Sequence, residues 1–272
     1  MRNIAYSELI LLNHDVLENV DRLAAVGSNR IELMMDAAGW DIYRSNYKDL
    51  IAGLNERGLH YSVHPAAWDI NLTAEMGILR DAAYRHHLDA LEFSAQIGAS
   101  QMVLHPGFAN SPCFSKETAR KRAFETTCKL AEIAKKSGVK LAYENVGYNG
   151  QSIYTMEEFI HALDGVDSIV GYLVDIGHAN VNHWDIPALI RAVSHRLFGL
   201  HIHDNTGKGD NHLPIGRGTS DWHGIYDAMQ EIKNPDCEFI LEYAPGLPLT
   251  YLEEGKALLE TNIYVASEML GN

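Results

Sequence analysis

Residues 197–222 read LFGLHIHDNTGKGDNHLPIGRGTSDW, and the pattern of this stretch is the key to the whole chain. It opens on four apolar or small residues, as a buried strand does, and then changes into a glycine-rich segment with few apolar side chains. The polar segment contains three histidines and three aspartates: His201, His203, Asp204, Asp210, His212 and Asp221. This pattern indicates a strand whose end and following loop bind a metal ion, and a polar surface loop is the alternative.

Apolar runs of strand length alternate with helical stretches along the whole chain. Strands are predicted at residues 4–6, 30–34, 60–63, 101–104, 139–143, 169–174, 197–200 and 239–241. Helices are predicted at residues 15–26, 46–57, 78–97, 117–137, 156–163, 186–193, 224–232 and 252–269. Eight strand-then-helix units without a linker predict an α/β fold, a single (β/α)8 TIM barrel domain over residues 1–272.

The third to the eighth predicted strands each end in a histidine or a carboxylate. In chain order these side chains are His64, His105, Glu144, Asp175, His201 and Glu242. Strand ends converge at the C-terminal face of such a barrel, where active sites form. Polar groups gathered there would bury like charges at a high cost unless a cation were bound between them. The pattern therefore predicts a metal site at this face.

Three further ligand-type residues lie close to these strand ends. His178 follows Asp175 by three residues in DIGH, and Asp210 and His212 belong to the DNH sequence of the loop. The complete set has five histidines and four carboxylates, which suits zinc, manganese or cobalt, whereas calcium would call for oxygen ligands alone. Nine side chains exceed the need of one ion, so up to three divalent ions are expected, with zinc the first choice.

Other polar side chains admit a functional or a structural role. His203 shares the strand face of His201, so it is expected to face substrate or to support a ligand. Glu32, in RIELM, is expected to point into the barrel, either in a functional role or as half of a buried pair. His86 and His87 lie in the middle of a predicted helix and are expected to be solvated.

Composition limits the classes of function. Hydrophobic residues make up 46% of the chain, enough for a large core, and the formal net charge of −14 disfavours a broad nucleic-acid-binding surface. The three cysteines are widely spaced and form no CxxC pair, which is typical of a reducing compartment. No apolar run reaches the length of a membrane span. A cytoplasmic protein without a membrane partner is expected.

Several short motifs together resemble a known family. RIELM, SVHPA, MVLHPG, YEN, LVDIGHAN, the 197–222 segment and ILEY occur over nearly the whole length. The combination is similar to the xylose isomerase-like barrel superfamily, which contains endonuclease IV and many sugar isomerases and epimerases. The resemblance to endonuclease IV implies three zinc ions, bound respectively by His64, His105 and Glu144, by Glu144, Asp175, His201 and Glu242, and by His178, Asp210 and His212.

The resemblance to the ketose epimerases of this superfamily implies a smaller centre. One ion would then be bound by Glu144, Asp175, His201 and Glu242. In those enzymes the two glutamates also move the protons, and the histidine matching His178 contacts the substrate. The expected reaction is proton transfer next to a carbonyl through a metal-stabilised enediolate, with Glu144, Glu242 and His178 as the catalytic residues.

The loops near the predicted site bear on the choice between these activities. Asp36 and Asp41 lie in MDAAGWDIY after the second strand, where endonuclease IV has a basic and glutamine-rich stretch that enters the duplex. Trp40 and Trp68 fit either a base-stacking wedge or a wall of a sugar pocket. Arg217 would suit a phosphate in either enzyme.

We therefore predict a divalent-metal-dependent isomerase or epimerase whose partner is a small sugar or sugar phosphate. The alternative, favoured by the full nine-residue set, is an endonuclease IV-like zinc-dependent phosphodiesterase, and only this alternative implies abasic-site DNA as partner. A catalytically silent barrel that binds a polyol or a protein is a third hypothesis. A homo-oligomer is compatible with all three.

Overall fold

The computed structural model describes the whole chain except residues 1, 37–39, 41–42, 44–46 and 265–272. Its centre is a closed barrel of parallel strands that follow one another in chain order, and the last strand pairs with the first. The strands are β1 Asn3–Ser7, β2 Arg30–Met34, β3 His60–His64, β4 Gln101–Leu104, β5 Lys140–Glu144, β6 Val170–Asp175, β7 Leu197–Ile202 and β8 Glu238–Leu241. This arrangement confirms the predicted (β/α)8 barrel.

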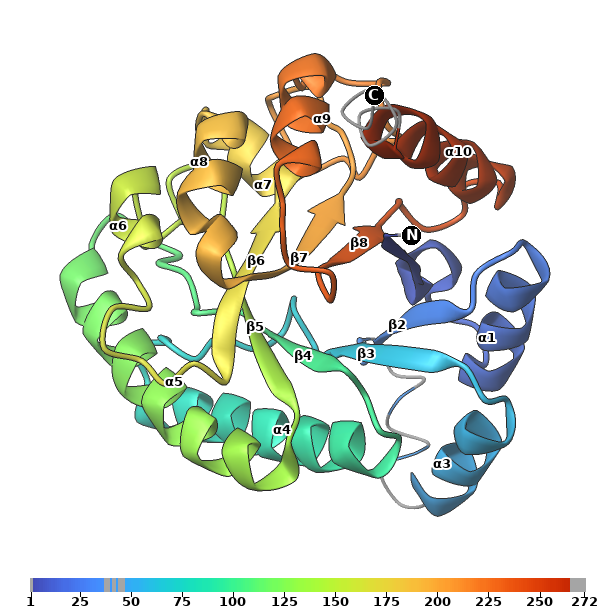
Figure 1. Cartoon of the computed structure of the whole chain (residues 1–272). Coiled ribbons are helices and arrows are strands. Elements are labelled where there is room, and N and C mark those ends of the chain that lie inside the picture. The colour runs from blue at the N-terminus through green and yellow to red at the C-terminus, as the bar shows by residue number, and fades with distance from the viewer. Residues whose placement is uncertain (1, 37–39, 41–42, 44–46, 265–272) are drawn as a thin grey trace.

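Helices surround the barrel on its outside, as Figure 1 shows. They are α1 Val16–Ala25, α3 Tyr47–Glu56, α4 Gly77–Gln96, α5 Lys116–Ser137, α6 Met156–Ile160, α7 Ile176–Val181, α8 Ile186–Val193, α9 Trp222–Gln230 and α10 Thr250–Tyr264. Two 3-10 helices, η1 Glu8–Leu11 and η2 Ser194–Arg196, lie directly after β1 and before β7. Among the described helices, none is both long and apolar enough to cross a bilayer.

The main hydrophobic core lies between the strands and the surrounding helices. A second, smaller cluster is formed within the barrel by five side chains from different strands: Ala5, Val103, Ala142, Leu173 and Ile240. Because strand residues alternate between two faces, the residues two positions further along point to the same side. The inner cluster therefore determines which side chains reach the C-terminal mouth of the barrel.

His86 and His87 of α4 are buried, so the expectation that they are solvated was wrong. The Nε2 atom of His86 accepts a hydrogen bond from the backbone N–H of Ala66, at a distance of 3.0 Å. Nδ1 of His87 lies 2.8 Å from the carbonyl oxygen of Ala83, and burial lowers the pKa of this imidazole to about 3. Both rings lie on the face of α4 that packs against the barrel, where backbone groups satisfy their nitrogens. Their position in the middle of a predicted helix does not show which face of the helix they occupy.

Candidate metal centre

The strand ends deliver their ligand-type side chains to one place at the C-terminal mouth. His105, Glu144, Asp175 and Glu242 each lie two residues beyond a member of the inner apolar cluster, so they continue its face of the strand. Parallel pairing also sets Asp175 opposite His201 on neighbouring strands. The apolar layer thus forms the support on which the polar layer rests.

Glu144 and His201 are the centre of this polar layer, and both are buried. Oε2 of Glu144 lies 2.8 Å from His105 Nε2 and 3.7 Å from His64 Nε2. The Nδ1 atom of His201 lies 3.3 Å from Glu144 Oε1, 3.5 Å from Glu242 Oε2 and 3.8 Å from Asp175 Oδ2. One ring nitrogen therefore faces three carboxylates.

The loop after β7 adds Asp210 and His212 to the same cluster. Its two sides are joined by a pair of backbone hydrogen bonds between Asp204 and Leu213, each 2.8 Å long. Oδ2 of Asp210 then lies 3.0 Å from His212 Nε2 and 3.3 Å from His178 Nε2. The structure accordingly brings all nine predicted ligand residues together.

Polar residues of this loop outside the nine-residue set have structural roles. Oδ1 and Oδ2 of Asp204 accept hydrogen bonds from the loop backbone, the Ser220 hydroxyl and the Trp222 indole N–H. Asp221 is the N-cap of α9 and accepts from the backbone N–H of Gly224. Both carboxylates therefore hold the loop in shape.

Asn145 is a residue of the site that the sequence analysis did not select. Its amide donates to the carbonyl oxygen of Asp175 (2.9 Å) and accepts from the backbone N–H of the same residue (2.8 Å). It thereby fixes the end of β6 against the end of β5. Its position directly after the strand-end Glu144 was the available signal.

The cluster contains buried polar atoms without a hydrogen-bond partner, and this observation tests whether a metal ion fits. They are Glu32 Oε1, His178 Nδ1, His201 Nδ1 and Nε2, His203 Nδ1 and Asp210 Oδ1. Such atoms are costly when buried unless an ion or another group satisfies them. Several triplets also have ligand atoms within 4.8 Å of one another, among them His64–Glu144–His201, Glu144–Asp175–His178 and His203–Asp210–His212. The donor set fits one or more divalent cations.

Charges within the cluster shift the pKa values strongly. Burial alone would raise the pKa of the Glu144 carboxyl, but His105 and His201 hold it well below its usual range. Burial would lower the pKa of His64, but hydrogen bonding and charge interaction with Glu144 raise it to about 9. Asp210 similarly raises the pKa of His212 to about 9 against the effect of burial. The carboxylates thus require nearby positive charge.

A cavity of about 490 Å³ opens directly above the cluster. Seven of the nine predicted ligand residues line it, while Asp175 and His201 lie buried outside its lining. Its other walls are largely apolar and include Leu9, Met34, Phe108, Val146 and Pro245. None of the described lining residues is a lysine or an arginine. The space is suited to a small polar molecule that meets acidic groups and imidazoles on one side and apolar walls on the other.

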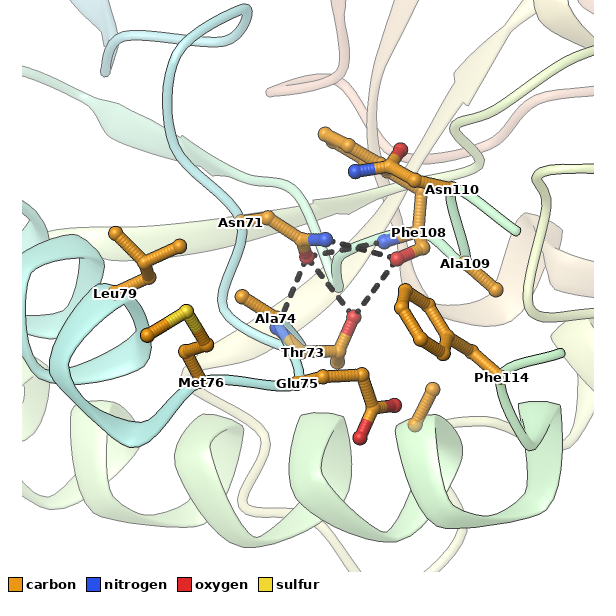
Figure 2. Close-up of a pocket in the computed structure, with 11 residues that line it drawn as sticks. Asn71, Thr73, Ala74, Glu75, Met76, Leu79, Phe108, Ala109, Asn110 and Phe114 are labelled. Carbon is orange, nitrogen blue, oxygen red and sulfur yellow. Dashed lines mark hydrogen bonds between the residues drawn. The ribbon is translucent and has the colours of Figure 1, made fainter.

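Phe108 and Asn110 separate this cavity from a smaller one of about 180 Å³, and both residues line both cavities. Figure 2 shows how the smaller cavity is built around Asn71 and Thr73. The Asn71 side chain donates to the carbonyl oxygen of Phe108 (2.8 Å), and its Oδ1 accepts from the Phe108 N–H (3.2 Å). These bonds tie the loop after β3 to the loop after β4 and hold Phe108 in place.

A comparison with protein families gives a match to the xylose isomerase-like TIM barrel family over residues 20–261. The chain belongs to this family. Inosose isomerase of Bacillus subtilis is 26% identical over 161 residues, which cover 56% of this chain and 58% of that enzyme. The match therefore spans less than two thirds of its length.

Two solved structures are similar to this xylose isomerase-like barrel in fold. The crystal structure of a D-tagatose 3-epimerase-like protein has a TM-score of 0.84 and 21% identity, covering 99% of this chain and 100% of that one. The structure of the IOLI protein with a bound zinc atom has a TM-score of 0.80 and 18% identity, covering 96% and 98%. At these identities the likeness shows the fold.

The sequence leaves a role in substrate binding open for five residues: Trp40, Trp68, Arg217, His203 and Glu32. Of these, Trp68 alone lines the large cavity, and its side chain is 60% exposed. Trp40 is buried and packs edge-on against Phe93, with ring centroids 5.6 Å apart. Arg217 is exposed and lies outside the lining of the cavity. Trp40 therefore belongs to the core, because its indole fills space between helices.

His203 and Glu32 also lie outside the lining of the cavity, and both are completely buried. His203 Nε2 is 3.0 Å from Asp175 Oδ2, and its ring stacks on His212 with centroids 3.9 Å apart. Glu32 Oε1 is 3.0 Å from His201 Nε2. Each of these side chains contacts a predicted ligand residue on the side away from the cavity, so a direct contact with substrate is not supported.

Asp36, in the loop after β2, is not the exposed acidic residue that the sequence suggests. Asp36 is buried, and its Oδ2 accepts a hydrogen bond of 2.8 Å from the backbone N–H of Ala67. It ties the loops after β2 and β3 together and does not present its charge to solvent. Asp41 lies outside the described residues.

Proposed function

We propose that the protein is a divalent-metal-dependent sugar isomerase or epimerase that moves a proton next to a carbonyl group. The observation that carries the proposal is that Glu144 and Glu242 both line one cavity of suitable size above a buried cluster of acids and imidazoles. The similarity to inosose isomerase supports the same class of reaction.

Glu144, Asp175, His201 and Glu242 would bind the catalytic ion, since the three carboxylates surround His201 Nδ1. Zinc is the first choice, and manganese or cobalt are compatible with the same ligands. When bound, such an ion would polarise the substrate carbonyl and stabilise negative charge that develops on its oxygen.

The residues of the chain itself would carry the proton. Glu144 and Glu242 both reach the cavity, so one carboxylate can take a proton from the carbon next to the carbonyl while the other returns it. His178 is the other candidate donor, because it lines the cavity and its Nδ1 lies 3.3 Å from Glu144 Oε1. The apolar walls would limit the access of water to the reacting carbon.

The lining of the cavity favours an unphosphorylated sugar over a sugar phosphate. A phosphate group is normally met by arginine, lysine or a cluster of backbone N–H groups. The described lining residues include no cationic side chain of this kind, and Arg217 does not reach the cavity. Sugar hydroxyls, in contrast, can bond to Asn110, Tyr148, Gln151 and Asn211, which line the same space.

An endonuclease IV-like phosphodiesterase is the second candidate, and one observation favours it. Asp210 contacts both His178 and His212, although a one-ion sugar enzyme does not require the Asp210–His212 pair. Zinc at these residues and at Glu144 would suit the hydrolysis of a phosphodiester. The described lining of the cavity contains no lysine or arginine, which speaks against a bound DNA backbone.

Solvent exchange tests the proposal. Zinc-, manganese- or cobalt-loaded protein is incubated with free ketoses in deuterated water, and NMR follows the loss of the carbon-bound proton and the formation of isomers. Exchange should stop with a chelator and in Glu144→Gln. Efficient incision of an abasic-site duplex by the same preparation, without exchange in any ketose, would overturn the proposal in favour of the nuclease.

A further inference from the structure

Glu32 has an unusual environment for a carboxylate. It lies on β2 inside the barrel, is completely buried, and does not border the large cavity. Its Oε2 accepts a hydrogen bond of 3.4 Å from the Ser62 hydroxyl, and its Oε1 lies 3.0 Å from His201 Nε2. In the described part of the chain no lysine or arginine forms an ion pair with it. A buried carboxylate is costly without a partner, so the contact with His201 accounts for its presence.

The two nitrogens of His201 face different surroundings. Nδ1 points toward Glu144, Glu242 and Asp175, which are ligand-type residues at the barrel mouth. Among the described carboxylates that lie within ion-pair distance of the His201 ring, Glu32 alone contacts Nε2. Both nitrogens are buried, and neither has an aligned hydrogen bond in the structure. The ring therefore has one side open to a cation and one side open to a hydrogen-bond acceptor.

We propose that Glu32 is a positioning residue that accepts the Nε2–H of His201, so that Nδ1 stays unprotonated and directed at the metal ion. This inference rests on the metal centre of the proposed function. A carboxylate behind a ligating imidazole fixes its tautomer and ring orientation and increases its basicity, and loss of such a partner costs about 10–100-fold in metal affinity. Glu32 thus acts through His201 and not on the substrate, in agreement with the buried pair, one of the two interpretations that the sequence allows.

Zinc affinity, measured by competition with a chromophoric chelator, gives the first test. Glu32→Leu removes the acceptor and should weaken zinc binding by about 10–100-fold while leaving the number of bound ions unchanged. Glu32→Gln keeps an acceptor oxygen and should lose less. The matched control is Glu238→Gln, since Glu238 is a buried carboxylate of β8 that pairs with Arg30 and Ser100. The control should bind zinc like the wild type.

A double-mutant cycle separates action through His201 from every other role. In a His201→Ala background, Glu32→Leu should have no further effect on zinc affinity, because its target has gone. In the wild type with zinc, nitrogen-15 spectra of histidine-labelled protein should show His201 as the Nε2–H tautomer. In Glu32→Leu this signal should shift or broaden.

Four results would overturn the inference. They are zinc affinity within twofold of wild type in Glu32→Leu, an equal loss in the His201→Ala background, an Nδ1–H tautomer in the zinc protein, and a lower ion count. The last would make Glu32 itself a ligand. Zinc binding by the wild type without sugar exchange would sink only the proposed function, because these readouts use zinc alone.

Discussion

Gly177 is the position at which a single methyl group should disturb the candidate metal centre most directly. A Cβ atom added there would lie 1.9 Å from Cε1 and 2.5 Å from Nδ1 of His203. The His203 ring has no free direction in which to move, because it is completely buried and stacks on His212 at 3.9 Å. Gly177→Ala must therefore displace His203 from Asp175, which it contacts at 3.0 Å.

The size of the effect follows from three terms. Overpacking a rigid site costs about 1–3 kcal/mol. Loss of a hydrogen bond to a charged group costs about 1.5–3 kcal/mol. Gly177 lies in α7, so the higher helix propensity of alanine offsets about 1 kcal/mol of this loss. We expect a net loss of about 3 kcal/mol, or roughly 6–12 °C in Tm for a domain of this size.

Thermal unfolding with and without zinc measures this loss. Gly77→Ala is the matched control. Gly77 is the first residue of α4, and the nearest atom to an added Cβ would be a guanidinium nitrogen of Arg80 at 3.6 Å. The control should unfold within about 2 °C of the wild type. In a His203→Ala background, Gly177→Ala should cost little. A Tm for Gly177→Ala close to that of the control, or the same loss without the His203 ring, would refute the steric argument.

Three further predictions concern the centre and the fold. If all nine candidate ligand residues bind metal, purified protein should contain two or three zinc-type ions by elemental analysis, and Asp210→Ala or His212→Ala should each lower that number by about one. A count near one, unchanged by either substitution, would exclude a trinuclear centre and favour the one-ion epimerase. Glu144→Gln should reduce activity by several orders of magnitude without unfolding the barrel, and activity above a tenth of wild type would place the chemistry elsewhere. Burial raises the pKa of Glu8 to about 7, so the folded chain keeps this proton between pH 4.5 and 7 after the unfolded chain has lost it. Stability falls as pH rises through this window. In urea unfolding, the free energy of unfolding of Glu8→Gln relative to that of the wild type should therefore increase by about 3 kcal/mol between pH 4 and pH 8. A difference that stays constant over this range would contradict the assignment.

The barrel was predictable because its strands combine two simple patterns. Each strand is a short apolar run, and a ligand-type residue follows the inward-facing positions at the C-terminal end, as in Ala142 and Glu144 or in Leu173 and Asp175. The short helix α7 was missed, since it begins directly after β6, at the capping residue Asp175. Asp175 ends a strand, caps a helix and is a candidate ligand, and its position in the sequence does not distinguish these three roles.

The roles of individual acidic residues were less predictable. Asp204 and Asp210 lie in the same loop and look alike in sequence, yet Asp204 is surrounded by N–H and O–H donors, whereas Asp210 keeps one buried oxygen without a partner. Which carboxylate has oxygens left for a cation depends on the donors that the folded loop supplies. The DNH sequence links Asp210 to His212, but nothing local in the sequence shows the donors that surround Asp204.

The residues that oppose a nuclease activity are not the ones that the sequence suggests. From the sequence, Asp36 and Asp41 are expected to be acidic residues that face the DNA. Asp36 instead accepts a hydrogen bond from Ala67 inside the protein, so its charge is no barrier to a duplex. What opposes a phosphate backbone is the cavity itself, whose described lining combines acids and imidazoles with apolar walls and contains no lysine or arginine. Because this property belongs to the candidate active site, it bears more directly on the substrate than the charge of a neighbouring loop does.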